Sequence, residues 1–307
     1  MMQSFTFMAQ KSEPHMVSSF YKYIRIEDPA KFQQVHLELC KSLNLKGRIL
    51  VGEEGINGSV CGKKSYIEKY KPALKNNPLF SDMEFKEQET EKQAFRKMFV
   101  RIRKEIVHSE LKADLKNAAP YITPEQLKQM LDKNEDIVLV DIRNNYESRI
   151  GKFKNAIILN INNFRDLPNS INEIKNLQYK KIVTYCTGGI RCEKASAYLI
   201  ENGFKNVNQL KGGILKFGEE FPDTYWRGKC FVFDDRLAIP LNKKNIEPLN
   251  ECAWCGKKCD DYTNCHNLDC DKLFICCEDC REKYNKSCCE ECCNSERRRK
   301  EFLIINS

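Results

Sequence analysis

The cysteines of this 307-residue chain are very unevenly distributed, and this constrains its fold more than any other feature. Twelve of the 17 cysteines lie between Cys252 and Cys293, while the preceding residues are rich in lysine and poor in cysteine. Residues 1–15 show no basic segment followed by an apolar core, so no secretory signal is expected there. A secreted disulfide protein rarely has this layout, whereas a local cysteine cluster in a cytoplasmic chain more often binds metal.

Pairs of cysteines separated by two residues recur in this cluster. Such pairs place two sulfurs within reach of one tetrahedral ion, and two pairs complete a four-cysteine zinc site. The region has few apolar residues, so bound metal would replace a missing hydrophobic core. We therefore expect structural zinc, with redox-active thiols or a poorly ordered tail as the alternatives. Adjacent doublets leave the pairing open, and the expected ligands are Cys252, Cys255, Cys265, Cys270, Cys276, Cys280, Cys288 and Cys292.

The N-terminal part of the chain alternates strand and helix patterns. Aromatic and polar residues alternate over 17–26, which predicts a strand, and apolar residues recur at helical spacing from Pro29 to Leu45. A second helix is expected over Lys63 to Leu74. The order β-α-β-β-α-β predicts a ferredoxin-like (acylphosphatase-like) α+β sandwich. The remaining strands are expected near 47–51, 59–61, 83–87 and 97–103, with a glycine-rich turn over 52–58.

Positive charge is concentrated upstream of residue 121. The formal net charge is +8, and residues 1–120 hold 21 Lys and Arg residues against 15 Asp and Glu residues. In the expected strand 98–103, Arg101 and Arg103 share one face, while Val100 and Ile102 share the other and fit the core. A basic face attracts nucleic-acid phosphates, so Arg101 and Arg103 are candidate RNA-binding residues. The alternative is an ordinary solvated face.

Residues 121–228 show the alternation of an α/β domain. Thr123-Pro124-Glu125-Gln126 is a strong helix start, with Thr at the N-cap, Pro at N1 and Gln at N3. Apolar runs at 137–140 and 181–185 predict central parallel strands. A helix is expected from Arg191 to Asn202, ended by Gly203, and Gly212-Gly213 opens the next one. Helices covering a mainly parallel sheet follow from this pattern, with further strands at 156–159 and 207–210.

The loop YCTGGIR, residues 185–191, joins a predicted buried strand to a predicted helix. Cys186 precedes a helix N-terminus, whose dipole stabilises a thiolate. The glycines allow successive backbone N–H groups to turn inward as an anion-binding nest, and Arg191 adds a permanent positive charge. We therefore take Cys186 as the reactive nucleophile. Its anion-binding cradle is expected to be Thr187, Gly188, Gly189, Ile190 and Arg191.

Three segments in the same order resemble the rhodanese superfamily. The loop at 185–191 is similar to the family's active loop, whose first residue is the cysteine that carries a persulfide. VDIRNNYE at 140–147 resembles the family's Asp-x-Arg segment, and LKGGI at 210–214 resembles its Gly-Gly turn. We expect Asp141 and Arg143 to organise the loop rather than perform chemistry. Cys192 is interpreted as a core residue, with a resolving thiol as the alternative.

Three signatures resemble the tRNA uridine(34) hydroxylases: GING at 55–58, TGGIRCEK at 187–194 and GKCFVFDDR at 228–236. This resemblance covers roughly residues 17–240. It implies an oxidoreductase that performs oxygen-dependent 5-hydroxylation of the wobble uridine of tRNA, with O2 as co-substrate and Cys186 essential. The expected partner is tRNA and the expected compartment is the cytoplasm. No DNA partner is expected, and no membrane, because the chain has no run of 18 apolar residues.

Two other functions remain open at this point. A thiosulfate or persulfide sulfurtransferase needs only the cysteine loop, and a non-catalytic RNA-binding zinc protein is disfavoured by the intact Cys186. The expected organisation is an N-terminal tail (1–16), a ferredoxin-like domain (17–105), a linker (106–120), a rhodanese domain (121–228), a connector (229–250), a cysteine-rich region (251–295) and a basic tail (296–307).

Overall fold

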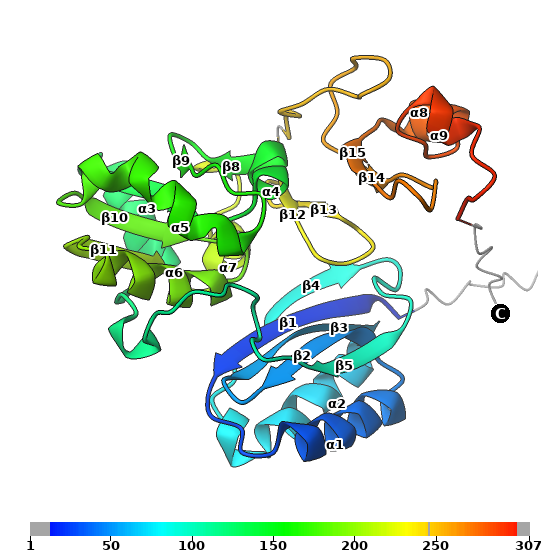
Figure 1. Cartoon of the computed structure of the whole chain (residues 1–307). Coiled ribbons are helices and arrows are strands. Elements are labelled where there is room, and N and C mark those ends of the chain that lie inside the picture. The colour runs from blue at the N-terminus through cyan, green and yellow to red at the C-terminus, as the bar shows by residue number, and fades with distance from the viewer. Residues whose placement is uncertain (1–12, 245, 300–307) are drawn as a thin grey trace, which may run out of the picture. The chain divides into compact units, whose positions relative to one another are not determined.

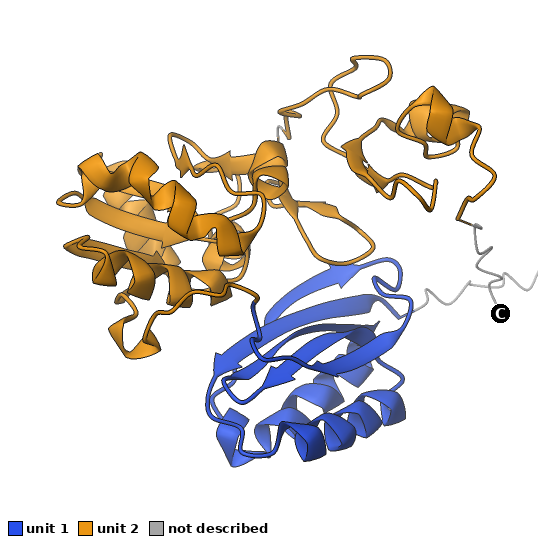
Figure 2. Cartoon of the chain, viewed as in Figure 1, with its two compact units in different colours: residues 1–107 blue, residues 108–307 orange. Residues whose placement is uncertain are grey.

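The computed structural model describes residues 13–244 and 246–299. These fall into two compact units, residues 1–107 and 108–307 (Figure 2). Of the two expected tails, residues 1–12 and 300–307 lie outside the described residues. No helix in the described ranges has both the length and the apolar composition that crossing a bilayer requires.

The first unit is a five-stranded sheet with two helices on one face (Figure 1). The strand order is β4-β1-β3-β2-β5, in which β3 pairs antiparallel with β1 and β2, and β1 pairs antiparallel with β4. This is the predicted ferredoxin-like arrangement, extended by an edge strand β5 that runs parallel to β2. The elements are β1 (His15–Tyr23), α1 (Pro29–Ser42), β2 (Lys46–Gly52), β3 (Gly55–Lys63), α2 (Lys64–Lys75), η1 (Pro78–Phe80), β4 (Lys86–Thr90) and β5 (Met98–Ile102).

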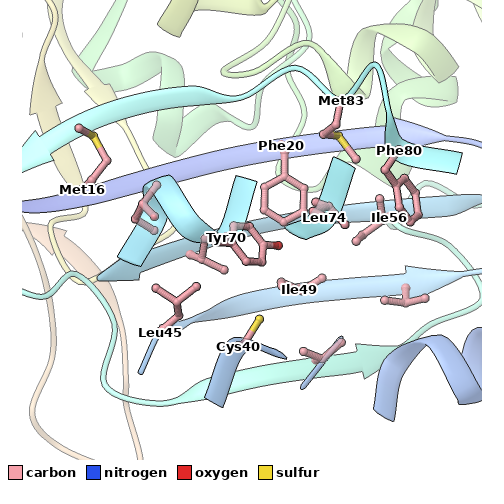
Figure 3. Close-up of a cluster of buried hydrophobic side chains, with 14 of the residues drawn as sticks. Met16, Phe20, Cys40, Leu45, Ile49, Ile56, Tyr70, Leu74, Phe80 and Met83 are labelled. Carbon is pink, nitrogen blue, oxygen red and sulfur yellow. The ribbon is translucent and has the colours of Figure 1, made fainter. Parts of the chain in front are cut away.

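The core of this unit lies between the sheet and its helices (Figure 3). Phe20 of β1 and Ile49 of β2 meet Tyr70 and Leu74 of α2, and all four side chains are almost fully buried. The Tyr70 hydroxyl lies 2.9 Å from Nε2 of His36, a buried residue of α1. Burial lowers the pKa of His36 to about 4, so this histidine is neutral at physiological pH and serves the packing of the two helices.

Four predicted boundaries in this unit are wrong: the strand expected near 83–87 is β4 (Lys86–Thr90), and the other three differ for local reasons. The first strand ends at Tyr23, and the first helix ends at Ser42 because Asn44 takes a left-handed conformation (φ 51°). The glycine-rich turn is shorter than expected, since β3 already begins at Gly55, where a Cβ atom would lie 2.0 Å from a backbone oxygen of β1. Val100 is buried as predicted, but Ile102 is 46% exposed at the end of the edge strand and adds little to the core.

The second unit contains the predicted parallel sheet with helices on both faces (Figure 1). Its strand order is β6-β11-β10-β7-β9, and every neighbouring pair is parallel. The Thr123 capping box opens α3 as expected. The elements are η2 (Leu115–Asn117), β6 (Tyr121–Ile122), α3 (Pro124–Asp132), β7 (Ile137–Asp141), α4 (Asn145–Ile150), β9 (Ile157–Ile158), η3 (Phe164–Asp166), α5 (Leu167–Ser170), η4 (Ile171–Leu177), β10 (Lys181–Tyr185), α6 (Ile190–Glu201), β11 (Asn206–Leu210) and α7 (Gly213–Glu220).

A small antiparallel sheet and the cysteine-rich region complete this unit. Tyr262 of the cysteine-rich region donates a hydrogen bond to the carbonyl of Tyr146 (2.9 Å), and Asn250, just before that region, donates one to the carbonyl of Arg149 (2.8 Å), so both segments pack against α4. Ile150 belongs to the same buried cluster as the cysteines. The elements are β8 (Gly151–Phe153), β12 (Trp226–Phe231), β13 (Ala238–Pro240), β14 (Tyr262–Asn264), β15 (Leu273–Ile275), α8 (Glu278–Lys283) and α9 (Glu290–Cys293).

Candidate functional site

The cysteine loop connects the carboxyl end of β10 to the start of α6, as predicted. Gly189 caps the helix with φ at 101°, a conformation that L side chains rarely adopt. This conformation directs the Gly189 N–H toward Sγ of Cys186, at 3.1 Å. Cys186 is completely buried, while Thr187, Gly188 and Ile190 are half-buried. The loop therefore curls around its own sulfur atom.

A buried ion pair holds the charged end of the loop in place. Arg191 donates two hydrogen bonds to the Glu147 carboxylate of α4, at 2.5 and 2.7 Å, and a third to the Thr187 hydroxyl at 3.3 Å. Burial alone would raise the pKa of Glu147, but the charge and hydrogen bonds of Arg191 lower it below its ordinary value of 4.5. The pair is therefore ionised at neutral pH, and the guanidinium stays fixed beside the cysteine loop.

The immediate neighbours of the Cys186 thiol lower its pKa. Burial opposes ionisation, but a hydrogen bond from Cys192, the charge of Arg191 and the backbone N–H groups of Arg191 and Gly189 lower the pKa of Cys186 to about 6. Burial and the neighbouring Cys186 raise the pKa of the Cys192 thiol, so Cys192 keeps its proton. Cys192 is buried in the core as expected, and in addition its S–H group serves as a donor to the Cys186 thiolate.

The residues that follow the Gly212-Gly213 turn hold the backbone of the cysteine loop by hydrogen bonds. The N–H groups of Ile214 and Leu215, at the start of α7, donate to the carbonyls of Cys186 (3.0 Å) and Thr187 (3.1 Å). Gly213 has φ at 64°, and a Cβ atom there would lie 2.5 Å from the Cys186 carbonyl oxygen. Only glycine therefore allows α7 to approach the loop this closely.

Asp141 and Arg143 form a second buried ion pair beneath the site. The Arg143 guanidinium donates two hydrogen bonds to Asp141, at 2.6 and 2.9 Å, and one to the Gly151 carbonyl at 2.6 Å, and the Arg143 backbone N–H donates to Asp141 at 3.0 Å. A longer bond of 3.4 Å reaches the Glu147 carbonyl. These contacts join the end of β7 to α4, which carries the Glu147 side chain. The contacts of the pair are therefore with the backbone and side chains around α4.

Two neighbours of the loop were not singled out from the sequence. Glu147 was part of the segment resembling rhodaneses, and its signal was its position three residues after the Asn144 helix cap, where it accepts the Asn144 N–H at 3.1 Å. Phe233 follows β12, is 54% exposed, and lies 5.8 Å from the Arg191 guanidinium. No local pattern predicted that contact, because the two residues belong to different elements.

Both candidate RNA-binding residues lie in the first unit. Arg101 is exposed on β5, and its guanidinium lies 4.6 Å from the centre of the Phe99 ring. Arg103, just after β5, is also exposed and donates to the neighbouring Ile102 carbonyl at 2.9 Å. The structure thus places these two arginines on the surface of a separate unit.

The cysteine-rich region brings eight cysteines into two groups of four. Within each group the sulfur atoms all lie within 4.8 Å of one another, as ligands of one tetrahedral ion would. The groups alternate along the chain, so that each takes two cysteines from a first segment and two from a second. They are Cys252, Cys255, Cys277 and Cys280, and Cys265, Cys270, Cys288 and Cys292.

One expected ligand is replaced by its neighbour. Cys277, not Cys276, joins the first group, where its Sγ lies 3.7 Å from that of Cys255. Cys276 continues β15, and its N–H donates to the Asp261 carbonyl at 2.9 Å. Successive side chains of an extended segment point to opposite sides, so only one member of the doublet can face the group. The cysteine-rich region also contains four cysteines outside both groups: Cys259, Cys276, Cys289 and Cys293.

Comparisons with known proteins cover almost the whole chain. Residues 15–106 match the UPF0176 acylphosphatase like domain, 123–220 the Rhodanese-like domain and 227–293 the Rhodanase C-terminal domain. A crystal structure of a rhodanese-like domain protein from Staphylococcus aureus is 26% identical, with a TM-score of 0.29, and covers 32% of this chain and 90% of that one.

Curated relatives are similar over nearly their full length. The tRNA uridine(34) hydroxylase of Cytophaga hutchinsonii is 42% identical over 92% of both chains. That of Bacillus cereus (strain B4264) is 43% identical over 94% of this chain and 92% of its own. Because relatives more than 40% identical match it over nearly the full length of both chains, this chain belongs to the tRNA uridine(34) hydroxylase family.

Proposed function

We propose that this protein hydroxylates C5 of the wobble uridine, position 34, of tRNA in an oxygen-dependent reaction, with Cys186 as the essential nucleophile. The observation that carries the proposal is the environment of one sulfur atom. The pKa of Cys186 is lowered to about 6, so the thiolate predominates at pH 7. A thiolate with fixed donors around it suits nucleophilic addition to an electron-poor ring.

The first chemical step would be addition of the Cys186 thiolate to C6 of uracil. A C6–S bond forms, and the electron pair of the C5–C6 double bond moves toward C5 and the adjacent carbonyl oxygen. Arg191 already makes two hydrogen bonds to Glu147, so it would stabilise this anion mainly through its charge. The electron-rich C5 can then react with an oxidant.

The oxygen atom would come from O2 that an external two-electron donor, such as a dithiol or a reduced flavin, has reduced to the level of a hydroperoxide. The C5 electron pair forms the C–O bond, and the second oxygen atom leaves in reduced form, as water when the oxidant is hydrogen peroxide. Loss of the C5 proton and cleavage of the C6–S bond then restore the uracil ring and release Cys186. The residues of this chain supply the nucleophile and the electrostatic environment in this scheme.

The substrate must enter a site whose sulfur is covered. Cys186 has no solvent exposure, so the base has to leave its stack, and side chains over the loop have to move, before the C6–S bond can form. An anticodon loop is single-stranded, which makes this extrusion less costly. Arg101 and Arg103 are the proposed contacts to tRNA phosphates, and the cytoplasm, where tRNA is used, is the proposed compartment.

The two cysteine groups would each hold a structural zinc ion. Four sulfurs within 4.8 Å of one another match a closed tetrahedral site, which leaves no open position for a substrate. Few apolar residues are available to this region, so the metal would supply much of its folding free energy. We assign zinc to the fold of residues 251–295, and we keep 17–105 and 121–228 as the limits of the other two domains.

Mass spectrometry of tRNA nucleosides tests the function directly. Cells lacking this protein are complemented with wild type, with Cys186→Ala, or with Cys230→Ala as a control at another buried cysteine. We expect wild type and Cys230→Ala to restore 5-hydroxyuridine and its derivatives, and Cys186→Ala to restore none. Full restoration by Cys186→Ala would refute the nucleophile. If 5-hydroxyuridine does not depend on the protein, and the purified chain transfers sulfur from thiosulfate to a thiol, the sulfurtransferase function replaces the hydroxylase.

A further inference from the structure

The sheet of the first unit has one face that its helices do not cover. The strand register places alternate residues on this face, which we call the open face: Ser19 and Tyr21 of β1 lie in rows with Ser59 and Asn57 of β3. The opposite side chains, such as Phe20, belong to the core. The rows continue onto β2 and β5, through Arg48 to Phe99 and through Leu50 to Arg101.

The charge of the open face is of one sign. No residue that the register places on this face within β1–β5, all of them described, is an aspartate or a glutamate. The acidic residues of β4 point to the helix side, where Glu87 pairs with Lys71 of α2 at 2.8 Å. The cations of the open face are Lys46, Arg48, Lys63, Lys86 and Arg101.

Aromatic rings lie among these cations. Phe99 is 37% exposed, and the Arg101 guanidinium lies 4.6 Å from its ring centre, which gives a large apolar side chain a defined position on the surface. On β1, the Lys86 ammonium lies 4.9 Å from the Tyr21 ring centre. Flat rings flanked by cations are the pattern on which unpaired bases stack while phosphates meet positive charge.

Both ends of the open face are closed by the chain itself, which limits the accessible area to its middle. At one end Ala94 packs on Val17 and Cys61. At the other, the Asn57 side chain donates to the carbonyl of the buried Ile106 at 2.8 Å. Arg48 and Phe99 lie in the row between these two contacts and are exposed, and Arg101, at the edge-strand end of the Asn57 row, is exposed as well.

We propose that the middle of the open face binds a single-stranded segment of RNA, with a base stacked on Phe99 and phosphates at Arg48 and Arg101. The inference rests on the proposed tRNA substrate. It adds base stacking to the phosphate contacts already proposed for the first unit. A face without acidic groups complements the phosphate backbone, and exposed rings on an antiparallel sheet are a general means of binding unpaired bases. The anticodon loop that contains the wobble uridine is such a segment.

Fluorescence anisotropy of a labelled oligouridine with full-length protein tests this assignment. Phe99→Leu keeps the apolar volume but removes the ring, and should weaken binding roughly 5- to 150-fold, whereas Phe99→Trp should bind as tightly as wild type or more tightly. Arg101→Gln and Arg48→Gln should each reduce the slope of log affinity against log salt by about 0.7. Matched controls are Tyr179→Ala, an aromatic residue that is 74% exposed in the other unit, and Lys69→Gln on the exposed side of α2.

Two outcomes would overturn the open-face proposal. Equal affinity of Phe99→Leu, Tyr179→Ala and wild type would exclude stacking on Phe99. Unchanged RNA affinity of Phe99→Leu together with a lower melting temperature would mean that the ring serves the stability of the first unit and not RNA binding. Hydroxylation of tRNA by the same proteins separates this test from the proposed function: if wild type binds oligouridine but forms no 5-hydroxyuridine, the function fails while the RNA surface stands.

Discussion

The cysteine loop and the cysteine-rich region use the same side chain in opposite electrostatic surroundings. Cys186 lies among hydrogen-bond donors and beside the Arg191–Glu147 ion pair. These neighbours stabilise a single thiolate without a metal ion. In each of the two cysteine groups four sulfurs gather within 4.8 Å, and four thiolates at that distance repel one another unless a cation binds. The two regions thus differ in neighbouring charge, which favours a lone thiolate in the loop and a bound cation in each cysteine group.

The largest expected effect is on the amount of zinc bound per chain, which should depend on the cysteine-rich region and not on the cysteine loop. Cys255→Ser removes one ligand of the first group, so bound zinc should fall from two ions per chain to one, and residues 251–295 should become sensitive to protease. Structural zinc sites contribute on the order of 10 kcal/mol of apparent folding free energy, so this loss is severe. Elemental analysis by mass spectrometry gives the zinc content.

Two matched variants complete this test. Cys293→Ser, in the same region but outside both groups, and Cys186→Ser in the loop should each retain two zinc ions. Loss of one ion from Cys186→Ser would contradict the division between nucleophile and ligand.

A smaller effect is expected from the ion pair that belongs to the loop alone. Glu147→Gln leaves Arg191 charged and buried without its partner, which should lower the free energy of unfolding by about 3–5 kcal/mol. Denaturant unfolding measures this, with Glu135→Gln as control, because its pair with Lys181 is partly solvent-exposed and is worth about 0–1 kcal/mol.

The pH dependence of the Glu147 contribution has a definite sign. The pKa of Glu147 is lowered in the folded state from 4.5, so its stabilising contribution is present above pH 4.5 and is lost as the pH falls through the folded pKa. In the denaturant experiment, equal destabilisation by Glu147→Gln and Glu135→Gln would show that the buried pair contributes no more to stability than the partly exposed one.

The smallest expected effect is a shift of one pKa. Alkylation of Cys186 by iodoacetamide, followed on its peptide by mass spectrometry, should rise with pH through a midpoint near 6 and then level off. In the double variant Glu147→Gln/Arg191→Gln no buried charge is left unpaired, and the midpoint should rise by about one unit, equivalent to about 1.4 kcal/mol. An unchanged midpoint would assign the activation to the backbone N–H groups and Cys192 alone.

Features set by neighbouring residues were predicted well from the sequence. The strand at 181–185 and the capping box at Thr123 were both predicted, because a buried apolar run and a helix start depend on a few adjacent side chains. The reactive position of Cys186 between strand and helix follows from the same kind of local pattern, and its role stays a prediction.

Features that depend on distant residues were not predictable in this way. Glu147 and Arg191 are 44 residues apart and meet only because Arg143 and the parallel sheet bring α4 to the loop. The choice of Cys277 over Cys276 depends on the residue at which β15 gives way to α8, and a cysteine doublet carries no signal of that boundary. Ile102 is exposed because β5 is an edge strand, and strand periodicity alone does not show how far the helices extend.

Helix α4 has a consequence for how preparations of this protein are compared. Glu147 of this short helix holds Arg191, while the carbonyls of its Tyr146 and Arg149 receive hydrogen bonds from Tyr262 of the cysteine-rich region and from Asn250 just before it. A batch with incomplete zinc would support α4 poorly, so its turnover per chain should fall in proportion to its metal occupancy. Such a correlation would arise because zinc stabilises the region that contacts α4, and it would not require a zinc ion at the reacting base.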